Sequence, residues 1–203
     1  SPTRENAIVT VGRFFSPGLG HAKRQLEMVE FFGRAHRSGM IPPDWRFYVV
    51  GGCEDSQRPY LAQVRAAGEG LPVEVIDNAP RARVEQLLST SSVFWSATGF
   101  GEDEAKAPWS SEHFGMTTVE AMAGGCVPVV IDKAGQKEIV REGVDGFRWT
   151  TPDQLIELTA RIAGDPALRD RLSASATVRA EDYSEQAFAD RWHAIADTRT
   201  LLG

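Results

Sequence analysis

The sequence lacks several features that would place it in a common class. Only two cysteines occur among 203 residues, which argues against a disulfide framework and indicates a reduced, intracellular protein. No apolar run approaches the roughly 20 residues that a membrane-spanning helix needs, and no signal-peptide pattern is present. The net charge of −6 leaves no basic surplus, so we expect no nucleic-acid partner. The composition is otherwise ordinary for a soluble globular protein.

The motifs of several familiar active sites are also missing. Cysteines and histidines are scattered, which does not favour a zinc site. No Gly-x-Ser-x-Gly elbow supports a serine nucleophile. The sequence Gly18-Leu19-Gly20 lies at the wrong distance from the preceding apolar run to be a dinucleotide fingerprint. We interpret the neighbouring His21 as a turn histidine, because no partner lies at a spacing typical of a metal site or a nucleophile.

Short apolar runs alternate with longer amphipathic segments along the chain. The predicted strands are Ala7–Val11, Arg46–Val50, Val73–Ile76, Val93–Ser96, Val127–Ile131 and Gly146–Trp149. The predicted helices between them are Lys23–Ser38, Pro59–Ala67, Arg81–Leu88, Met116–Ala123 and Gln136–Glu142. Such alternation, with glycine after several strands, predicts an α/β fold with a doubly wound, mostly parallel six-stranded Rossmann-like sheet.

The last part of the chain is predicted to be helical. Thr151-Pro152-Asp153-Gln154 has the form of a capping box with proline at the first helical position. Asp165, which precedes a proline, and Ser184 are further predicted N-caps. We therefore expect extra C-terminal helices on a single domain that spans residues 1–203.

The most informative stretch carries two carboxylates eight residues apart, Glu112 and Glu120, with a glycine between them. We place Glu112 on a loop and Glu120 in the first turns of a helix that starts near Met116 or Thr117. The free backbone N–H groups of residues 115–117 then lie between the two acids, and such groups at a helix start bind anions. The stretch predicts a pocket for a ligand with both phosphate and hydroxyl groups.

A second polar group follows the first predicted strand. Gly12 allows the backbone to approach a ligand, and Arg13 and Lys23 bring two cations to the strand end and the helix start. A cation at a helix N-terminus is unfavourable for the helix dipole, so an anionic ligand would explain it. Taken alone, the two cations could equally be solvated surface side chains.

The two glutamates also have simpler interpretations when each is taken alone. Glu112 would be an ordinary loop carboxylate and Glu120 a surface helix residue. However, Glu120 lies close to the apolar run Val127–Ile131, so its charge needs a partner. Hydroxyl groups of a sugar or ribose would serve, and so would a structural hydrogen bond to the loop.

Five segments together carry a recognisable pattern. Glu112–Glu120 has the form Glu-x7-Glu and is followed by Ala-Met-Ala-Gly-Gly-Cys-Val-Pro-Val-Val. The others are Val-Gly-Arg at 11–13 with Lys23 downstream, Val-Val-Gly-Gly at 49–52, Ala-Gly-Gln-Lys-Glu-Ile-Val at 134–140 and Gly-Val-Asp-Gly-Phe at 143–147. In this order they resemble the donor-site signature of retaining glycosyltransferases of family 4, over nearly all of residues 7–190.

The resemblance implies the C-terminal, donor-binding half of a two-domain enzyme of the GT-B architecture. Such enzymes bind their substrates in a cleft between two Rossmann-like domains. We expect the N-terminal acceptor domain to be absent from this chain, which begins at Ser1 and enters a strand at Ala7, as a fragment of a longer protein would. The half alone should bind donor but transfer nothing efficiently, because the cleft walls that exclude water are missing.

The resemblance also implies roles for single residues. Arg13 and Lys23 would hold the donor diphosphate, Gly12 would allow close approach, and Glu120 would bind the ribose hydroxyls. Glu112 would contact the hydroxyls of the transferred sugar in a positioning role. We therefore expect catalytic roles for Glu112, Arg13 and Lys23.

Further donor contacts follow from the same resemblance. The backbone N–H groups near the helix start would complete the sugar and phosphate contacts (Phe114, Gly115, Met116 and Thr117). The turn at Asn78 and the neighbouring Arg83 lie where the family usually seats the nucleobase. Two cations and a helix start would take the role that a divalent metal has in other transferases, so we expect neither metal nor cofactor.

Several alternatives remain open at this stage. The chain could be a non-catalytic module that senses a nucleotide or scaffolds a partner, although both acids and both cations speak against this. It could belong to a nucleotide-sugar epimerase of the same architecture, but Glu-x7-Glu favours the transferase. The long segment Gly99–Ser111 departs from the short approach of many members and is a candidate for shaping donor or acceptor choice.

The expected partners are a nucleotide sugar, linked to UDP or GDP, and an acceptor. The acceptor would be a glycan, a lipid or a small molecule bound through the missing half. We expect a cytoplasmic protein, and membrane association at the inner face only through that missing half.

Overall fold

The computed structural model describes residues 4–18, 22–103, 106 and 112–200, and for residues 191 and 194–200 it describes the backbone only. Six strands form one sheet in the order β3-β2-β1-β4-β5-β6. The strands are β1 (Glu5–Val11), β2 (Arg46–Gly51), β3 (Val73–Asp77), β4 (Ser91–Ser96), β5 (Val127–Ile131) and β6 (Phe147–Trp149). All neighbouring strands of this sheet are parallel, which confirms the predicted Rossmann-like fold and makes the sheet wholly rather than mostly parallel.

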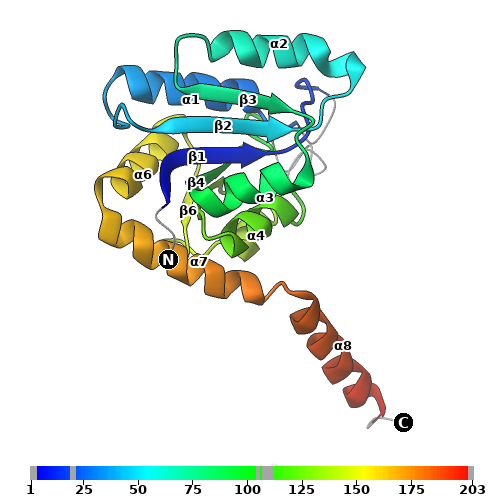
Figure 1. The fold of residues 1–203 in the computed structure, drawn as a ribbon. Coiled ribbons are helices and arrows are strands. Elements are labelled where there is room, and N and C mark those ends of the chain that lie inside the picture. The colour runs from blue at the N-terminus through cyan, green and yellow to red at the C-terminus, as the bar shows by residue number, and fades with distance from the viewer. Residues whose placement is uncertain (1–3, 19–21, 104–105, 107–111, 201–203) are drawn as a thin grey trace.

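Helices cover both faces of the sheet (Figure 1). One face is covered by α1 (Gln25–Arg37), α2 (Arg58–Ala67), which follows the short 3-10 turn η1 (Asp55–Gln57), and α6 (Pro152–Gly164). The other is covered by α3 (Arg81–Thr90), α4 (Met116–Ala123), α5 (Gln136–Ile139) and much of α7 (Pro166–Glu181). The last helix, α8 (Glu185–Thr200), projects away from the sheet (Figure 1).

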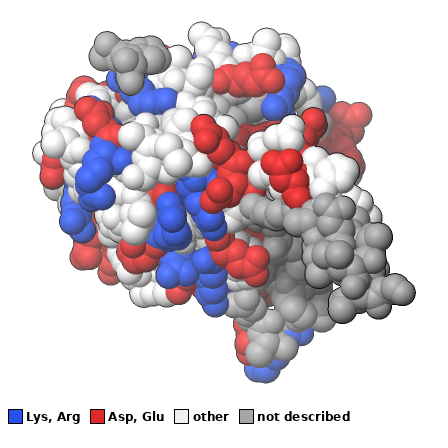
Figure 2. Space-filling view, turned by 90° about the horizontal axis from the view of Figure 1, so that it is seen from below, with Lys and Arg blue, Asp and Glu red and all other residues white. Residues whose placement is uncertain are grey.

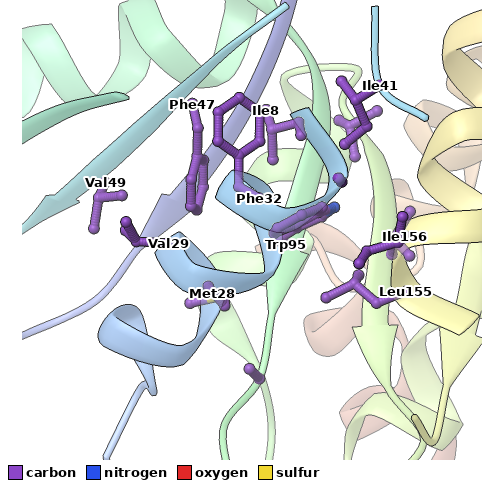
Figure 3. Packing of buried hydrophobic residues seen from close by; sticks show 14 of the residues in the cluster. Ile8, Met28, Val29, Phe32, Ile41, Phe47, Val49, Trp95, Leu155 and Ile156 are labelled. Carbon is purple, nitrogen blue, oxygen red and sulfur yellow. The ribbon is translucent and has the colours of Figure 1, made fainter. Parts of the chain in front are cut away.

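Aromatic side chains fill the core between α1 and the sheet (Figure 3). Phe47 of β2 lies between Phe32 of α1 and Trp95 of β4, with ring centroids 5.5 and 5.3 Å away. The indole N–H of Trp95 donates to Thr159 Oγ1 of α6 at 2.9 Å, so the polar atom of this buried ring is satisfied. This packing joins α1 and α6 to the middle of the sheet and fixes the strand ends that carry the loops described below.

The helix ends follow the predicted capping chemistry with two corrections. Thr151, Asp165 and Ser184 each accept a hydrogen bond from a backbone N–H three residues later, as predicted. The predicted helix 136–142 is wrong at its end, because α5 stops at Ile139 and Glu142 instead forms a bridge with Gly146.

The second correction concerns the start of α1. The helix begins at Gln25 and not at Lys23, because Arg24 has the left-handed backbone conformation, with φ 59°. The buried side-chain amide of Gln25 donates to Gly12 O and Arg13 O, both at 3.0 Å, and thereby holds the helix start against the loop after β1. Lys23 therefore lies in a loop and not on the polar face of a helix.

The two cysteines are free and buried. Burial raises the pKa of the Cys126 thiol to about 12. Within the described part of the chain no helix is both long and apolar enough to cross a membrane. His21 and most of the segment Gly99–Ser111 lie outside the described residues.

Candidate functional site

The carboxyl ends of β1 and β4 lie side by side at the point where the strand order of the sheet reverses. From β1 the chain passes through α1 to β2, and from β4 it passes through α4 to β5, on the opposite side. In doubly wound sheets ligands bind at such a switch point. A pocket lies here, lined by Thr10, Val11, Lys23, Phe94, Trp95, Ser96, Ala97, Thr98, Glu112, Gly115, Thr117 and Thr118.

An ion pair between Lys23 and Glu112 lies in this pocket. The ammonium of Lys23 donates to Glu112 Oε2 across 89 residues of sequence, and each side chain is 24% exposed. The stem of Lys23 lies against Gly12, where an added Cβ would be 2.6 Å from Lys23 Cγ. Gly12 thus provides the room that the lysine needs, a contact that the sequence did not reveal.

The loop after β1 is held by buried polar groups. Gln25 is only 1% exposed, and its carbonyl oxygen lies 3.4 Å from the hydroxyl of Tyr60, which donates to it. Burial raises the pKa of Tyr60 to about 12, so this hydroxyl stays protonated at neutral pH. The guanidinium carbon of Arg13 lies 4.8 Å from the ring centroid of Phe15. The structural role of Gln25 and Tyr60 was not predicted from the sequence. Sequence alone does not distinguish a buried polar residue on a helix from an exposed one.

The start of α4 forms another wall of the pocket. Gly115 is the N-cap with φ 85°, and its carbonyl accepts from Thr118 N and Val119 N at 2.9 and 3.2 Å. The N–H groups of residues 115–117 precede the first intrahelical bonds and have no acceptor in the part of the chain that is described. The predicted helix start at Met116, with Glu112 outside the helix and Glu120 inside, is confirmed.

The segment around α5 supports the loop that carries Glu112. Gly135 N donates to Glu112 O at 3.0 Å, and Thr118 Oγ1 donates to Gln136 Oε1 at 3.0 Å. A Cβ added to Gly115 would lie 3.0 Å from Gln136 Nε2, so both the positive φ and the packing favour glycine there.

The second glutamate has a partner that the sequence did not indicate. Arg81, the first residue of α3, donates from Nη1 to Glu120 Oε1 at 3.0 Å and from Nε to Glu85 Oε1 at 2.7 Å. These hydrogen bonds, first that to Glu85, raise the pKa of Arg81. The need of Glu120 for a partner is therefore met by an arginine rather than by the loop. Glu120 is not among the described residues that line the pocket, and it lies one turn beyond Thr117 on α4.

The remaining predicted site residues differ in their contacts and in their exposure to solvent. The side-chain amide of Asn78 binds the backbone of Cys53, accepting from its N at 3.0 Å and donating to its O at 3.3 Å. Arg83 is partly exposed and donates to Gln86 Oε1 at 3.0 Å. Phe114 and Met116 are both exposed. The structure thus brings Lys23, Glu112, Gly115 and Thr117 into one pocket and gives Asn78 a role in the loop after β2.

Two further features of the molecule concern metal binding and the distribution of surface charge. Among the described residues, no three His, Cys, Asp or Glu side chains gather in a way that could hold a metal ion. Basic and acidic side chains alternate over the face seen in Figure 2 and form no continuous basic surface there.

Comparison with known proteins identifies the family. The model of the family described as "Glycosyl transferases group 1" matches residues 1–179. The chain belongs to this family. The predicted recognition of a glycosyltransferase domain is thereby confirmed.

One curated relative is a GDP-Man:Man(3)GlcNAc(2)-PP-Dol alpha-1,2-mannosyltransferase of Dictyostelium discoideum. It is 26% identical over 196 residues, which cover 94% of this chain and 36% of that protein. The chain thus spans about a third of the length of this relative.

Solved glycosyltransferase structures share the fold. A mutant of S. aureus TarM, in complex with Fondaparinux, alpha-GlcNAc-glycerol and UDP, has a TM-score of 0.71 at 14% identity over 95% of this chain and 35% of that one. The C-terminal domain of a glycosyl transferase group 1 family protein (LpcC) from Francisella tularensis has a TM-score of 0.64 at 17% identity, over 87% of this chain and 85% of that one. Likenesses at these identities establish the Rossmann-like fold found in GT-B enzymes.

Proposed function

We propose that this chain is the nucleotide-sugar donor-binding half of a retaining glycosyltransferase of the hexosyltransferase type. The whole protein transfers a sugar from a UDP- or GDP-linked donor to a glycan, lipid or small-molecule acceptor. The observation that carries the proposal is the Lys23–Glu112 ion pair at the switch point of the sheet, beside the start of α4. A cation, a carboxylate and free helix N–H groups in one pocket suit a ligand with both phosphate and hydroxyl groups.

The diphosphate is assigned to Lys23, Arg13 and the start of α4. An ammonium has three N–H donors, and Glu112 accepts from Lys23, which leaves further donors for phosphate oxygens. Arg13 is exposed beside Phe15 and makes no ion pair within the described part of the chain. When the sugar–phosphate bond breaks, negative charge grows on the leaving diphosphate, and preorganised positive groups lower the barrier. Because these groups supply the positive charge, the proposal requires no divalent metal or other cofactor.

Glu112 is assigned to the hydroxyl groups of the transferred sugar. Its side chain is fixed by Lys23 and its backbone carbonyl by Gly135 N, so the carboxylate has a defined position before the donor arrives. Such preorganisation lowers the entropic cost of binding. In this role Glu112 positions the sugar and does not form a covalent intermediate, which is consistent with front-face attack by the acceptor.

Glu120 is assigned to the ribose and the turn after β3 to the nucleobase. Glu120 is partly exposed and pairs with Arg81 through Oε1. Its Oε2 has no partner among the described residues, and we assign that atom to a ribose hydroxyl. The amide of Asn78 is used by the backbone of Cys53, so the backbone of residues 78–80, rather than that side chain, faces the base in this proposal. Arg83 remains a candidate contact on the first turn of α3.

The relatives support a nucleotide sugar but differ in the base. The name of the Dictyostelium relative specifies GDP-mannose, whereas the TarM structure contains UDP and a sugar-bearing molecule. We assign the acceptor, and any membrane contact, to a second domain outside these 203 residues. This chain alone then binds donor without efficient transfer, because water is not excluded from the pocket. The free, buried cysteines support a cytoplasmic location.

Calorimetric titration of the chain with UDP, GDP and their sugar conjugates tests the proposal. We expect Lys23→Met to weaken binding of the preferred nucleotide about thirtyfold, which corresponds to about 2 kcal/mol for a hydrogen bond to a charged group. The matched control is Arg34→Met, which removes a cation near the other end of α1, where Arg34 lies 2.7 Å from Asp153. Binding of neither nucleotide, or an equal loss in both variants, would contradict the proposal.

A form of the protein that includes the acceptor half separates a transferase from a non-catalytic sensor. We expect Glu112→Ala to lower transfer about a hundredfold or more while the chain stays folded and still binds the nucleotide. Full activity of that variant would rule out the role of Glu112. A product with inverted anomeric configuration would rule out the retaining assignment.

A further inference from the structure

Arg179, near the end of α7, binds several groups outside its own helix. Its Nη2 donates to Glu138 O at 2.7 Å and to Tyr183 Oη at 2.8 Å, and its Nε donates to Ile139 O at 3.2 Å. Its Nη1 pairs with Asp182 Oδ2 at 2.7 Å. The side chain is only 21% exposed. A guanidinium suits this place because its planar fork can reach several oxygen atoms at once.

Tyr183 extends these contacts to the loop that carries Glu112. Its hydroxyl donates to Glu138 O at 3.0 Å, and the guanidinium carbon of Arg179 lies 5.1 Å from its ring centroid. The ring meets Phe114 edge to face, with centroids 5.8 Å apart and an interplanar angle of 72°. Phe114 is half exposed and lies two residues after Glu112, so the tyrosine gives this loop its aromatic support.

The short helix α5 holds the same loop from another side. Gly135, its N-cap, donates its N–H to Glu112 O at 3.0 Å. With four residues, α5 is too short to be stable alone, and its last carbonyls need partners. Those of Glu138 and Ile139 accept from Arg179 and Tyr183. The end of α7 therefore fixes α5, and α5 fixes the backbone of Glu112.

We propose that Arg179 and Tyr183 are positioning residues that hold loop 112–115, and with it the Glu112 carboxylate, in place for the sugar of the donor. Neither residue is among the described residues that line the pocket, so both act through Glu112 and Phe114. The inference rests on the proposed function for the identity of the ligand, but not for the positioning of the loop. Loss of either residue weakens recognition of the sugar while recognition of the nucleotide is retained.

Hydrogen exchange measures the positioning without a ligand. We expect Arg179→Met to raise the exchange rate of the Gly135 amide about tenfold, because its acceptor Glu112 O is no longer held. Amides of the central strands, such as Val9 and Val49, keep their rates. The matched control is Arg161→Met, which removes an arginine 5.4 Å from the ring centroid of Phe147 on the face covered by α6. Unchanged exchange at Gly135 would overturn the inference.

Titration with a nucleoside diphosphate and with its sugar conjugate gives the second readout. In Arg179→Met we expect the Kd for the sugar conjugate to rise about fivefold, while the Kd for the nucleoside diphosphate is unchanged. Tyr183→Phe keeps the ring against Phe114 and loses the hydroxyl, so its effect is smaller. An equal loss for both ligands would overturn the positioning role. A chain that binds neither ligand would contradict the proposed function, and hydrogen exchange would still decide the role of Arg179.

Discussion

The two glutamates of the candidate site differ in how their carboxylates are held. Glu112 pairs with Lys23, both side chains are 24% exposed, and Gly135 fixes its backbone. Glu120 pairs with Arg81, whose side chain is 64% exposed and also contacts Glu85, while Glu120 itself is 33% exposed. One carboxylate is therefore fixed within a pocket, and the other lies on a surface where water and ligands can compete for it.

This difference indicates two modes of recognition within one site. A partly buried pair is screened little by solvent, whereas an exposed pair contributes little to stability and exchanges partners readily. We infer that the sugar and phosphate side is preorganised and that the ribose side adapts when the donor binds. Each of the following variants changes either the sugar and phosphate side of the site or the ribose side.

The largest effect is expected on the preorganised side. Glu112→Ala removes the partner of Lys23 and the sugar contact together, and we expect transfer by a form of the protein with its acceptor half to fall about a hundredfold or more. Steady-state transfer assays measure this loss. Glu120→Ala, assayed in parallel, should lose less, and a larger loss in that variant would reverse the comparison.

Gly115→Ala tests the start of α4. The residue has φ 85°, and its new Cβ would lie 3.0 Å from Gln136 Nε2, so we expect a loss of about 2 kcal/mol in the free energy of unfolding. Urea denaturation measures this quantity. Gly164→Ala is the control, since nothing lies within 4 Å of a Cβ there. Equal stability of the two variants would show that the helix start is not constrained.

Gly12→Ala displaces Lys23 without changing any charge. The added Cβ would lie 2.6 Å from Lys23 Cγ, so the ammonium must move. We expect about a tenfold weaker affinity for the nucleotide, since small displacements of binding groups are costly. Calorimetry gives the Kd, and unchanged binding would mean that the position of Lys23 is not critical.

Arg81→Ala tests the adaptable side and should have the smallest effect. We expect the preference for a ribonucleotide over its 2′-deoxy analogue to change only about twofold, because Arg81 and Glu120 are solvent-accessible. Arg58→Ala, which removes another exposed pair, with Asp55 at 2.8 Å, is the control. A change as large as that of Lys23→Met would show that both sides are equally preorganised.

Local chemistry made much of this structure predictable from the sequence. Short apolar runs, two of them directly followed by glycine, predicted the strands, and proline next to Thr151 and Asp165 predicted two helix starts. The position of Gly115 between two acids predicted the start of α4 with Glu112 outside it. These features depend on residues close together in the chain, which is why they can be recognised without a structure.

The remaining contacts could not be predicted because they join distant segments. Arg81 and Glu120 lie 39 residues apart, and Arg179 lies 41 residues from Glu138. On the sequence each arginine looks like a solvated helix residue. The loop position of Lys23 was also hidden, because a non-glycine residue such as Arg24 rarely adopts the left-handed conformation that delays α1.

The most direct measurement of the central claim is chemical-shift mapping of the 203-residue chain during titration with UDP or GDP. If the diphosphate binds between Lys23 and the start of α4, the backbone amides of Gly12, Arg13, Gly115 and Met116 shift together and saturate at one ligand concentration. Shifts confined to other parts of the sheet, or no shift at these amides with either nucleotide, would contradict the account.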